Sequence, residues 1–241
     1  MRRRVQAGAK LIVCAGGDST LSEIVNGLYR GSQGGREVPK LALYCGLQQG
    51  DFIRSLPQRK TFIEFLTAYL NGNAIEEKID VGEARFTGDY GQQVRRLFVN
   101  AAGFGFSSAL VDRLSRDYRI SRTKFNFLRF VARLLPLYRH PEVDVFLDGK
   151  QIYSKEDILT GLVHNGNYGA YGLLLSPRSN LSDGKLEYTL ILKSFGYKYL
   201  LSVFPLFAGR LRNVSFVRQN FCKELRVASS LASRKVRIDF D

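Results

Sequence analysis

The stretch LIVCAGGDSTLSEIVNGLYR, residues 11–30, predicts a strand, a glycine turn and a helix in succession. The apolar run Lys10–Ala15 is typical of a buried strand, and a helical face follows at the spacing i, i+3, i+4 and i+7, formed by Leu21, Ile24, Val25 and Leu28. The glycines between them permit positive φ and close backbone approach. The helix N-terminus presents unpaired N–H groups with partial positive charge, so this turn is a candidate phosphate site.

The same turn has a purely structural explanation. Thr20 and Glu23 form the T-x-x-E pattern of a capping box, which any strand-to-helix turn can carry. The local sequence leaves phosphate binding and simple helix capping open.

Composition narrows the classes of partner. The 241 residues are 45% hydrophobic and 24% charged, which is typical of a folded protein. An excess of 36 Lys+Arg over 22 Asp+Glu gives a net charge of +14, which favours a phospholipid surface, nucleic acid or a phosphorylated small molecule as partner. No recognised nucleic-acid-binding motif occurs, which argues against nucleic acid.

Cysteine spacing and hydropathy predict a cytoplasmic protein. Cys14, Cys45 and Cys222 are isolated and form neither a disulfide framework nor a zinc pattern, as in a reducing compartment. No apolar stretch approaches the roughly 20 residues that span a bilayer. We therefore expect a chain that can lie peripherally at a membrane without crossing it.

The predicted secondary structure changes from α/β to mainly strands after residue 75. Before it, a strand over Leu41–Cys45 and a helix from Phe62 to Tyr69, ended by Asn71-Gly72, predict a parallel α/β sheet with a boundary near Asn73. After it, one helical stretch over Ser107–Leu137 interrupts a series of predicted strands. These strands are Lys78–Phe86, Arg95–Ala102, Val143–Tyr153, Ile158–His164, Leu186–Lys193, Leu225–Ala228 and Val236–Phe240.

Three collinear motifs resemble one family. GGDSTLSEIVNGL, residues 16–28, is similar to the Gly-Gly-Asp-Gly-Thr segment of the diacylglycerol kinase and sphingosine kinase catalytic-domain superfamily. FVNAAGFGFSSALV, residues 98–111, resembles the segment that opens the family's second domain. HNGNYGAYGLLLSPRSNLSDGKLEYTLI, residues 164–191, resembles its glycine-rich segment and following Asp-Gly turn.

The resemblance implies a fold and an activity. We expect an α/β protein with an incomplete NAD-kinase-like nucleotide-binding domain, residues 1–75, followed by a β-rich, β-sandwich-like lipid-binding domain, residues 76–241. The implied reaction is phosphorylation of a lipid hydroxyl by ATP with Mg²⁺. The alternative is a catalytically inactive relative that binds anionic membrane or a protein partner.

The resemblance also implies site residues. Asp18 is the expected catalytic base, and local hydrogen bonding within the turn is the alternative for it. Asp51 either orders a Mg²⁺-bound water or caps the helix that starts at Phe52. A second Mg²⁺ site is implied at Asp183, flanked by the carbonyls of Asn180 and Lys185, since Mg²⁺ prefers oxygen ligands; an ordinary polar hairpin turn is the alternative there. The phosphate loop comprises Gly16, Gly17, Asp18, Ser19, Thr20, Leu21, Ser22 and Glu23.

Some positions depart from the family pattern. In CGLQQGDFIRSL, residues 45–56, Gln48 replaces a Thr and Gly50 replaces an Asn of the second glycine-rich signature. Ser19 replaces a Gly, which would cost about 1 kcal/mol or more if the position needs positive φ. Asp241 matches the first residue of an Asp-Gly-Glu turn whose Glu would lie beyond it. We expect either a fragment of a longer protein or a degenerate member.

A basic and aromatic stretch predicts membrane contact. The basic candidates on a helix beside aromatic residues are Arg122, Lys124, Arg129 and Arg133. A core helix with a solvated basic edge is the alternative. The two histidines, His140 and His164, are expected to be structural or solvated. Self-association through an exposed strand edge is open.

Overall fold

The computed structural model describes most of the chain. The described residues are 8–32, 38–44, 50–56, 61–116, 123–201, 205, 208–230 and 236–241. Cys45, Gln48 and Arg122 lie outside them, and the side chain of Lys124 is not described.

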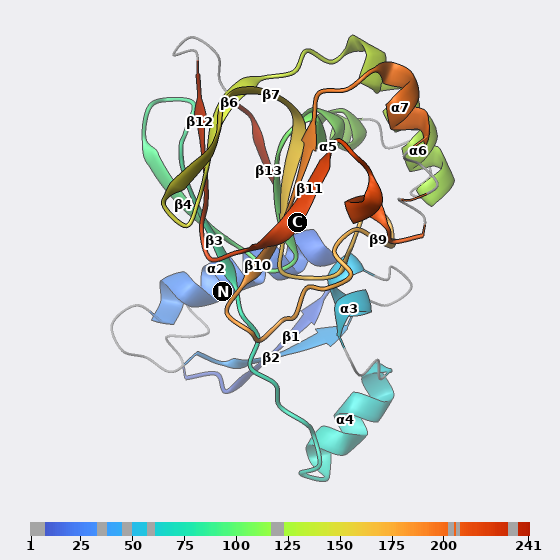
Figure 1. Cartoon of the computed structure of the whole chain (residues 1–241). Helices are drawn as coiled ribbons and strands as arrows, with labels where there is room; N and C mark the ends of the chain where they lie inside the picture. The colour runs from blue at the N-terminus through green and yellow to red at the C-terminus, as the bar shows by residue number, and fades with distance from the viewer. Residues whose placement is uncertain are drawn as a thin grey trace.

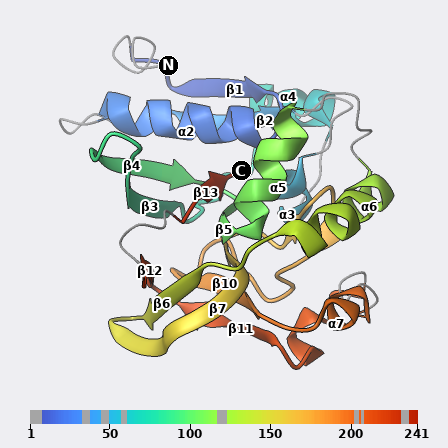
Figure 2. The same ribbon diagram turned by 90° about the horizontal axis from the view of Figure 1, so that it is seen from above.

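The N-terminal part contains a two-stranded sheet and three helices. Strands β1 (Leu11–Ala15) and β2 (Lys40–Tyr44) pair in parallel, with Ile12 beside Leu41, as the alternation of strand and helix predicted. Helix α2 (Asp18–Ser32) follows β1 and lies between this sheet and the hairpin of β3 (Gly82–Thr87) and β4 (Gln93–Phe98) (Figure 2). The short helix α3 (Asp51–Ser55) comes next.

Helix α4 (Phe62–Leu70) has clear local signals at both ends. The Thr61 side chain accepts from the Glu64 N–H, and the Glu64 carboxylate accepts from the Thr61 N–H, a complete capping box. The helix ends at Asn71, before Gly72 at φ 71°, as predicted. Residues 71–81 then lead to β3 without helix or strand, and the domain boundary near Asn73 stays a prediction.

The C-terminal part is built on a seven-stranded sheet (Figure 1). The first half of its longest strand, β7, pairs with β6, and its second half pairs with β5 and β10, so the sheet divides into two arms. The strands are β5 (Ala101–Gly105), β6 (Glu142–Leu147), β7 (Lys150–His164), β10 (Leu186–Leu192), β11 (Val217–Cys222), β12 (Leu225–Ser229) and β13 (Ile238–Phe240).

Short elements complete this part. A small hairpin joins β8 (Tyr168–Gly169) to β9 (Leu173–Leu174). The helical elements are α5 (Phe106–Arg116), α6 (Lys124–Leu134), η1 (Leu135–Leu137), α7 (Gly196–Leu201) and η2 (Leu211–Asn213).

The structure corrects several predicted elements. The stretch predicted as one helix over Ser107–Leu137 holds two described helices, and α6 begins at the Thr123 cap, whose side chain accepts from the Asn126 N–H. The strand predicted from Lys78 begins only at Gly82. Its first residues are held instead by a bond from the Asp80 N–H to a carbonyl of the 180–185 turn.

Two other predicted strands are each divided. The strand predicted over Arg95–Ala102 is β4 and β5, separated by two residues whose N–H groups bind Asp241. The strand predicted over Val143–Tyr153 is a β6–β7 hairpin that turns at Asp148 and Gly149, at φ 47° and 82°. Strand β11 was not predicted, because an inward-facing Gln219 interrupts its apolar alternation; its amide donates to Leu175 O and Thr189 Oγ1.

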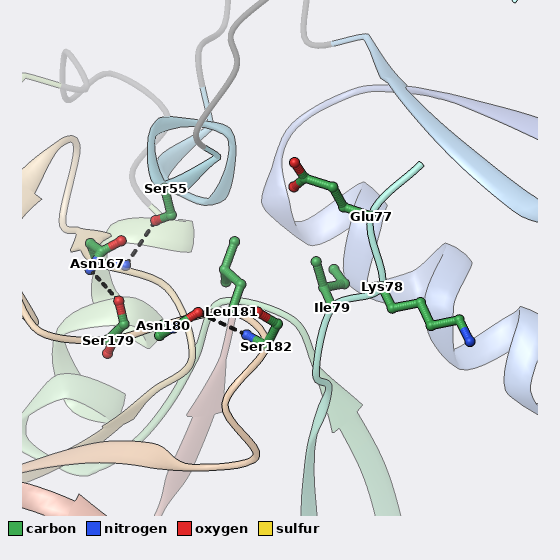
Figure 3. A pocket seen from close by; sticks show the side chains of 9 residues that line it. All are labelled: Ser55, Glu77, Lys78, Ile79, Asn167, Ser179, Asn180, Leu181 and Ser182. Carbon is green, nitrogen blue, oxygen red and sulfur yellow. Dashed lines mark hydrogen bonds between the residues drawn. The ribbon is translucent and has the colours of Figure 1, made fainter. Parts of the chain in front are cut away.

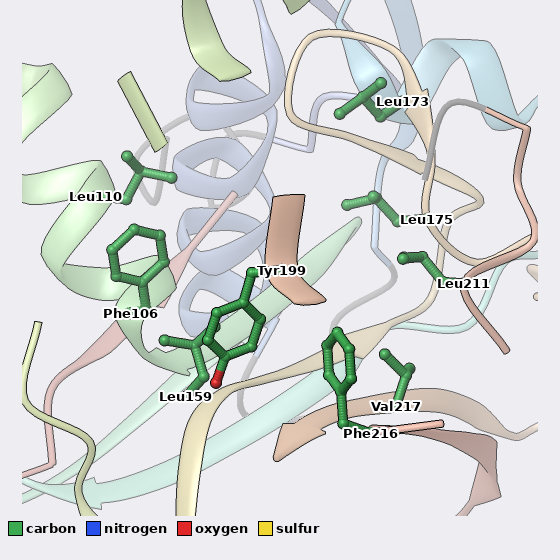
Figure 4. Packing of buried hydrophobic residues seen from close by; sticks show 9 residues of the cluster. All are labelled: Phe106, Leu110, Leu159, Leu173, Leu175, Tyr199, Leu211, Phe216 and Val217. Carbon is green, nitrogen blue, oxygen red and sulfur yellow. The ribbon is translucent and has the colours of Figure 1, made fainter. Parts of the chain in front are cut away.

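Three apolar clusters form the core. One lies between the sheet and helices α5, α6 and α7 (Figure 4). A second, with Ile158 and Leu190, lies among the strands of the two arms. The third joins Cys14, Leu21 and Phe52 of the N-terminal part to Val99 and Leu181 of the C-terminal part. Side chains from the two parts are therefore packed together at the junction.

Other sequence expectations concern cysteines and the membrane. Cys14 and Cys222 are buried thiols that are not in a disulfide. Within the described ranges, we find no helix that combines the length and the apolar character needed to cross a bilayer.

Candidate functional site

The turn between β1 and α2 is a tight glycine turn. The Gly16 N–H donates to Tyr44 O at 3.0 Å, which fixes the turn to β2. A Cβ on Gly16 would lie 2.6 Å from the Thr20 Oγ1, so this glycine is needed for close approach. Neither Gly16, Gly17 nor Ser19 has positive φ, so Ser19 carries no left-handed strain.

Residues of the predicted phosphate loop face different ways. The helix begins at Asp18, so Thr20 lies inside it and is not its N-cap. Glu23 is exposed and pairs with Arg96. Leu21 and Ser22 are buried, and the Leu21 N–H donates to Gly17 O, whereas Ser19 and Thr20 are exposed.

Asp18 binds the N-terminus of helix α3. Its Oδ2 accepts from the Asp51 N–H at 2.7 Å and its Oδ1 from the Phe52 N–H at 3.2 Å. Gly50, the N-cap position, has no side chain to do this, and a Cβ there would lie 2.3 Å from Asp18 Oδ1. The Asn-to-Gly departure therefore provides the space for Asp18. Asp51 is the first residue of α3 and does not cap it.

The Asp51 side chain reaches the glycine-rich segment instead. Its Oδ2 accepts from the Tyr171 N–H at 3.0 Å, and Asn167 N–H donates to Ser55 Oγ at 2.8 Å. Ala170 and Tyr171 both have positive φ, 51° and 66°, which is costly for non-glycine residues. The bond from Asp51 helps hold this left-handed turn.

The two carboxylates affect each other. Burial raises the pKa of Asp18, against the lowering effect of the two α3 N–H groups and Arg54. Burial also raises the pKa of Asp51, and the charge of Asp18 raises it further. Asp51 Oδ1 lies 3.9 Å from Arg54 Nε and has no hydrogen-bond partner among the described residues.

Asp241 brings a third carboxylate to the same place. It accepts from the N–H groups of Val99, Asn100 and Ala101 at 2.7, 3.0 and 2.6 Å. Burial raises the pKa of Asp241 to about 6, and the nearby charge of Asp18 adds to this. The carboxylates of three distant segments are thus neighbours.

The two asparagine motifs meet beside these acids. Asn100 O accepts from the N–H groups of Asn165 and Gly166 at 2.8 and 3.1 Å. The amide of Asn100 donates to Tyr168 O, and that of Asn165 donates to Val99 O. In the part of the chain that the structure describes, the Oδ1 atoms of both asparagines are buried without a hydrogen-bond partner. Both asparagines lie within the motifs quoted from the sequence, but only Asn165 is followed directly by a glycine.

The predicted metal turn is exposed and locally bonded. Asp183 Oδ1 accepts from the Lys185 N–H at 3.0 Å, and Asn180 Oδ1 from the Ser182 N–H at 3.1 Å. Asp80, which sequence reasoning missed, accepts from the Gly184 N–H at 2.7 Å. Over the described ranges, no three His, Cys, Asp or Glu side chains gather as a metal site. A site built from main-chain carbonyls at Asn180 and Lys185 stays a prediction.

A polar pocket of about 480 Å³ separates this turn from α3 (Figure 3). Ser55 of α3 and Asn167 line it, with Asn180 from the turn. The view shows Lys78 pointing away from these side chains. Glu77, Ile79 and Leu181 also line the pocket, which therefore combines hydroxyl and amide groups with a carboxylate and apolar side chains.

The histidines are outside this site. His164 is fully buried, its ring nitrogens have no hydrogen-bond partner among the described residues, and burial lowers its pKa to about 4. It is buried and structural, and the solvated alternative is wrong for it. His140 Nε2 lies 3.2 Å from Tyr199 Oη. Of the predicted membrane-contact residues, Arg129 and Arg133 are exposed on α6.

Comparisons with known proteins agree on one family. A diacylglycerol kinase of Bacillus subtilis (strain 168) is 28% identical over 185 residues, 76% of this chain and 55% of the relative. A diacylglycerol kinase of Staphylococcus carnosus (strain TM300) is 23% identical over 193 residues, 80% of this chain and 58% of the relative. The chain thus spans a little over half the length of these relatives. No protein-family model matches.

Solved structures agree on the fold. A diacylglycerol kinase structure from Bacillus anthracis str. Sterne has a TM-score of 0.58 at 18% identity, covering 99% of this chain and 72% of that one. Yeast NADH kinase complexed with NADH has a TM-score of 0.52 at 14% identity, covering 97% and 53%. These matches confirm the resemblance to the diacylglycerol kinase-like lipid kinase superfamily and the NAD-kinase-like two-domain fold that the motifs imply.

Proposed function

We propose that the chain is the kinase domain of a lipid kinase, which transfers phosphate from ATP to a lipid hydroxyl. One observation carries the proposal: the carboxylates of Asp18, Asp51 and Asp241 lie together beside the glycine turn and the N-terminus of α2. A helix N-terminus suits a phosphate, and adjacent carboxylates suit a base and a cation. The names of the curated relatives support the same reaction class.

Asp18 is the proposed general base. Its raised pKa makes the carboxylate a better proton acceptor than an exposed aspartate, while its two N–H donors favour the ionised form. The lipid hydroxyl would donate its proton to Asp18 as its oxygen attacks the terminal phosphorus of ATP, and the bond from that phosphorus to the bridging oxygen would break to release ADP. The N–H groups at the start of α2 would orient the phosphates.

The oxygen atoms present fit a hard cation. Asp51 Oδ1 is buried without a hydrogen-bond partner among the described residues, and carboxylate oxygen is a preferred Mg²⁺ ligand. We propose that Asp51 holds Mg²⁺, directly or through water. When bound, Mg²⁺ would neutralise charge on the transferred phosphate.

One observation favours the non-catalytic alternative. Both oxygens of Asp18 are already bonded to α3, which leaves this side chain fewer lone pairs for a substrate proton. In that case the chain binds anionic lipid or a protein partner without turnover. We propose a cytoplasmic location with peripheral membrane contact for either function.

Phosphate transfer from labelled ATP distinguishes the lipid kinase from the non-catalytic alternative. The acceptors are diacylglycerol, sphingosine and ceramide in anionic mixed micelles with Mg²⁺, and the variant is Asp18→Asn. We expect one labelled lipid and a loss of about a thousandfold in Asp18→Asn.

The matched control is Asp148→Asn. Asp148 also accepts two backbone N–H groups, from Lys223 and Glu224, but lies in a hairpin away from the site. Its activity should equal that of the unmodified chain. Absence of label on every lipid, in protein with a cooperative unfolding transition, would refute the kinase and favour the binding function.

A further inference from the structure

Three large apolar side chains are exposed at one end of the C-terminal part. They are Leu137 at the end of η1, 78% exposed, and Phe195 and Tyr197 at the start of α7, 70% and 61% exposed. We call these three residues the aromatic tip. Exposed apolar groups that gather in one place mark an interaction surface more often than scattered ones do.

Two contacts hold the parts of the aromatic tip together. Tyr199 Oη lies 3.2 Å from Nε2 of His140, which closely follows η1, and it accepts from the Ser194 N–H at 2.8 Å. The rings of Phe195 and Tyr197 stack, with their centroids 6.2 Å apart. The tip is therefore an ordered feature of the fold.

The segment that holds Leu137 and the segment that holds Phe195 and Tyr197 pack against the same core cluster. Leu134, Leu135 and Tyr138 pack against the cluster that contains Tyr199 and Leu211. Figures 1 and 2 accordingly draw α6 and α7 at the same end of the C-terminal part. With its inner side occupied by this cluster, the tip presents its apolar atoms outward.

The surroundings of the aromatic tip are mainly basic. Lys198 Nζ lies 5.6 Å from the centroid of the Phe195 ring, and Arg139 is exposed. Lys193 is paired with Asp157 at 2.6 Å, so that pair is neutral. Further exposed basic residues on neighbouring elements are Arg129, Arg133, Arg210 and Arg212.

We propose that the aromatic tip inserts into the headgroup region of an anionic bilayer, with Arg139 and Lys198 contacting lipid phosphates. Aromatic rings favour this depth, and each basic residue near an anionic surface strengthens binding about fivefold. The inference rests on the proposed function, because a lipid kinase must reach substrate in a membrane. The proposed membrane-contacting surface therefore includes α7 as well as the basic face of α6 that the sequence predicted.

Helix α6, which precedes Leu137 in the chain, contacts the segment that binds Asp51. Phe127 of α6 packs edge-on against Tyr171, with centroids 5.9 Å apart. The Tyr171 N–H in turn donates to Asp51. A bilayer that orders α6 would therefore act next to the turn that Asp51 holds.

Tryptophan fluorescence tests the insertion directly, because the chain has no Trp. Phe195→Trp reports the tip. Tyr90→Trp is the matched control, since Tyr90 is 95% exposed in the β3–β4 hairpin. With vesicles of phosphatidylglycerol and phosphatidylcholine, we expect Phe195→Trp emission to shift to the blue and to be quenched by brominated lipid, while Tyr90→Trp is unchanged.

Vesicle sedimentation measures the contribution to affinity. Phe195→Ser with Tyr197→Ser should weaken binding at least about tenfold, and Tyr90→Ser should leave it unchanged. Vesicles of phosphatidylcholine alone should bind weakly to all variants, since the basic residues then have no anionic partner.

Three outcomes would overturn the proposal. They are equal fluorescence changes at both tryptophans, full vesicle binding by the double variant, and a blue shift that depends on protein concentration without vesicles, which would assign the tip to a second copy. Neither assay requires turnover. Loss of kinase activity with intact tip insertion would therefore refute only the proposed reaction.

Discussion

The two parts of this chain differ in how completely they are packed. The C-terminal part has a seven-stranded sheet with two buried apolar clusters. The described residues of the N-terminal part form two strands, and α2, β2, α3 and α4 line an apolar pocket of about 690 Å³ together with residues 74–83, Leu97 and Val99. Yet the N-terminal part supplies Asp18 and Asp51. The comparison teaches that the proposed chemistry lies in the more open part, where N–H groups of α3 hold Asp18 and the Tyr171 N–H of the denser part holds Asp51.

The largest expected effect is on stability. Leu190 is completely buried in a strand of the C-terminal sheet, so Leu190→Ala should lower the free energy of unfolding by about 3 to 5 kcal/mol. Leu28 is also buried, but it lines the existing apolar pocket, so Leu28→Ala should cost about 2 kcal/mol. Urea unfolding followed by circular dichroism measures both. Equal costs would show that the two parts are equally well packed.

The pH dependence of the free energy of unfolding distinguishes the buried His164 from the site carboxylate of Asp241. His164 has its pKa lowered from 6.5 to about 4, so between these values the unfolded chain binds a proton that the folded chain excludes, and stability falls as pH falls. Asp241 has its pKa raised from 3.8 to about 6, so the folded chain holds the extra proton and stability rises as pH falls. Each contribution is about 3 kcal/mol, and they oppose each other.

Replacing His164 and replacing Asp241 should therefore change the pH dependence of the free energy of unfolding in opposite directions. From pH 6 to pH 4, His164→Leu should gain stability relative to the unmodified chain, and Asp241→Asn should lose it. Urea unfolding at a series of pH values checks the signs. The same slope in both variants would contradict the opposed roles of the buried histidine and the site carboxylate.

A smaller effect on kinase activity tests the hydrogen bonds between Asp18 and α3. Gly50→Ala places a Cβ 2.3 Å from Asp18 Oδ1, so the carboxylate must move away from α3. We expect kinase activity to fall about tenfold, equivalent to about 1.4 kcal/mol, while global stability changes little. Gly196→Ala meets no atom within 4 Å and is the control. Unchanged activity in Gly50→Ala would mean that the Asp18 contact with α3 is not needed.

Local sequence signals were sufficient where a structure depends on neighbouring residues. The strand, glycine turn and helix over residues 11–30 follow from periodicity, and α4 ends where Asn71-Gly72 predicted. Local sequence signals failed where residues far apart in the sequence determine the structure. Thr20 belongs to a capping pattern, but the helix begins earlier, at Asp18. Strand β11 was missed because the partners that satisfy Gln219 lie 30 and 44 residues away.

The sequence by itself determined the family resemblance, the parallel β1–β2 unit and the identity of Asp18 and Asp51 as site candidates. Only the tertiary structure decided what these residues contact. Asp18 binds N–H groups 33 and 34 residues away, Asp51 binds one 120 residues away, and Asp241 binds three that are 140 to 142 residues away. The physical reason is that a buried carboxylate needs hydrogen-bond donors, and here the packing of segments far apart in the sequence supplies them.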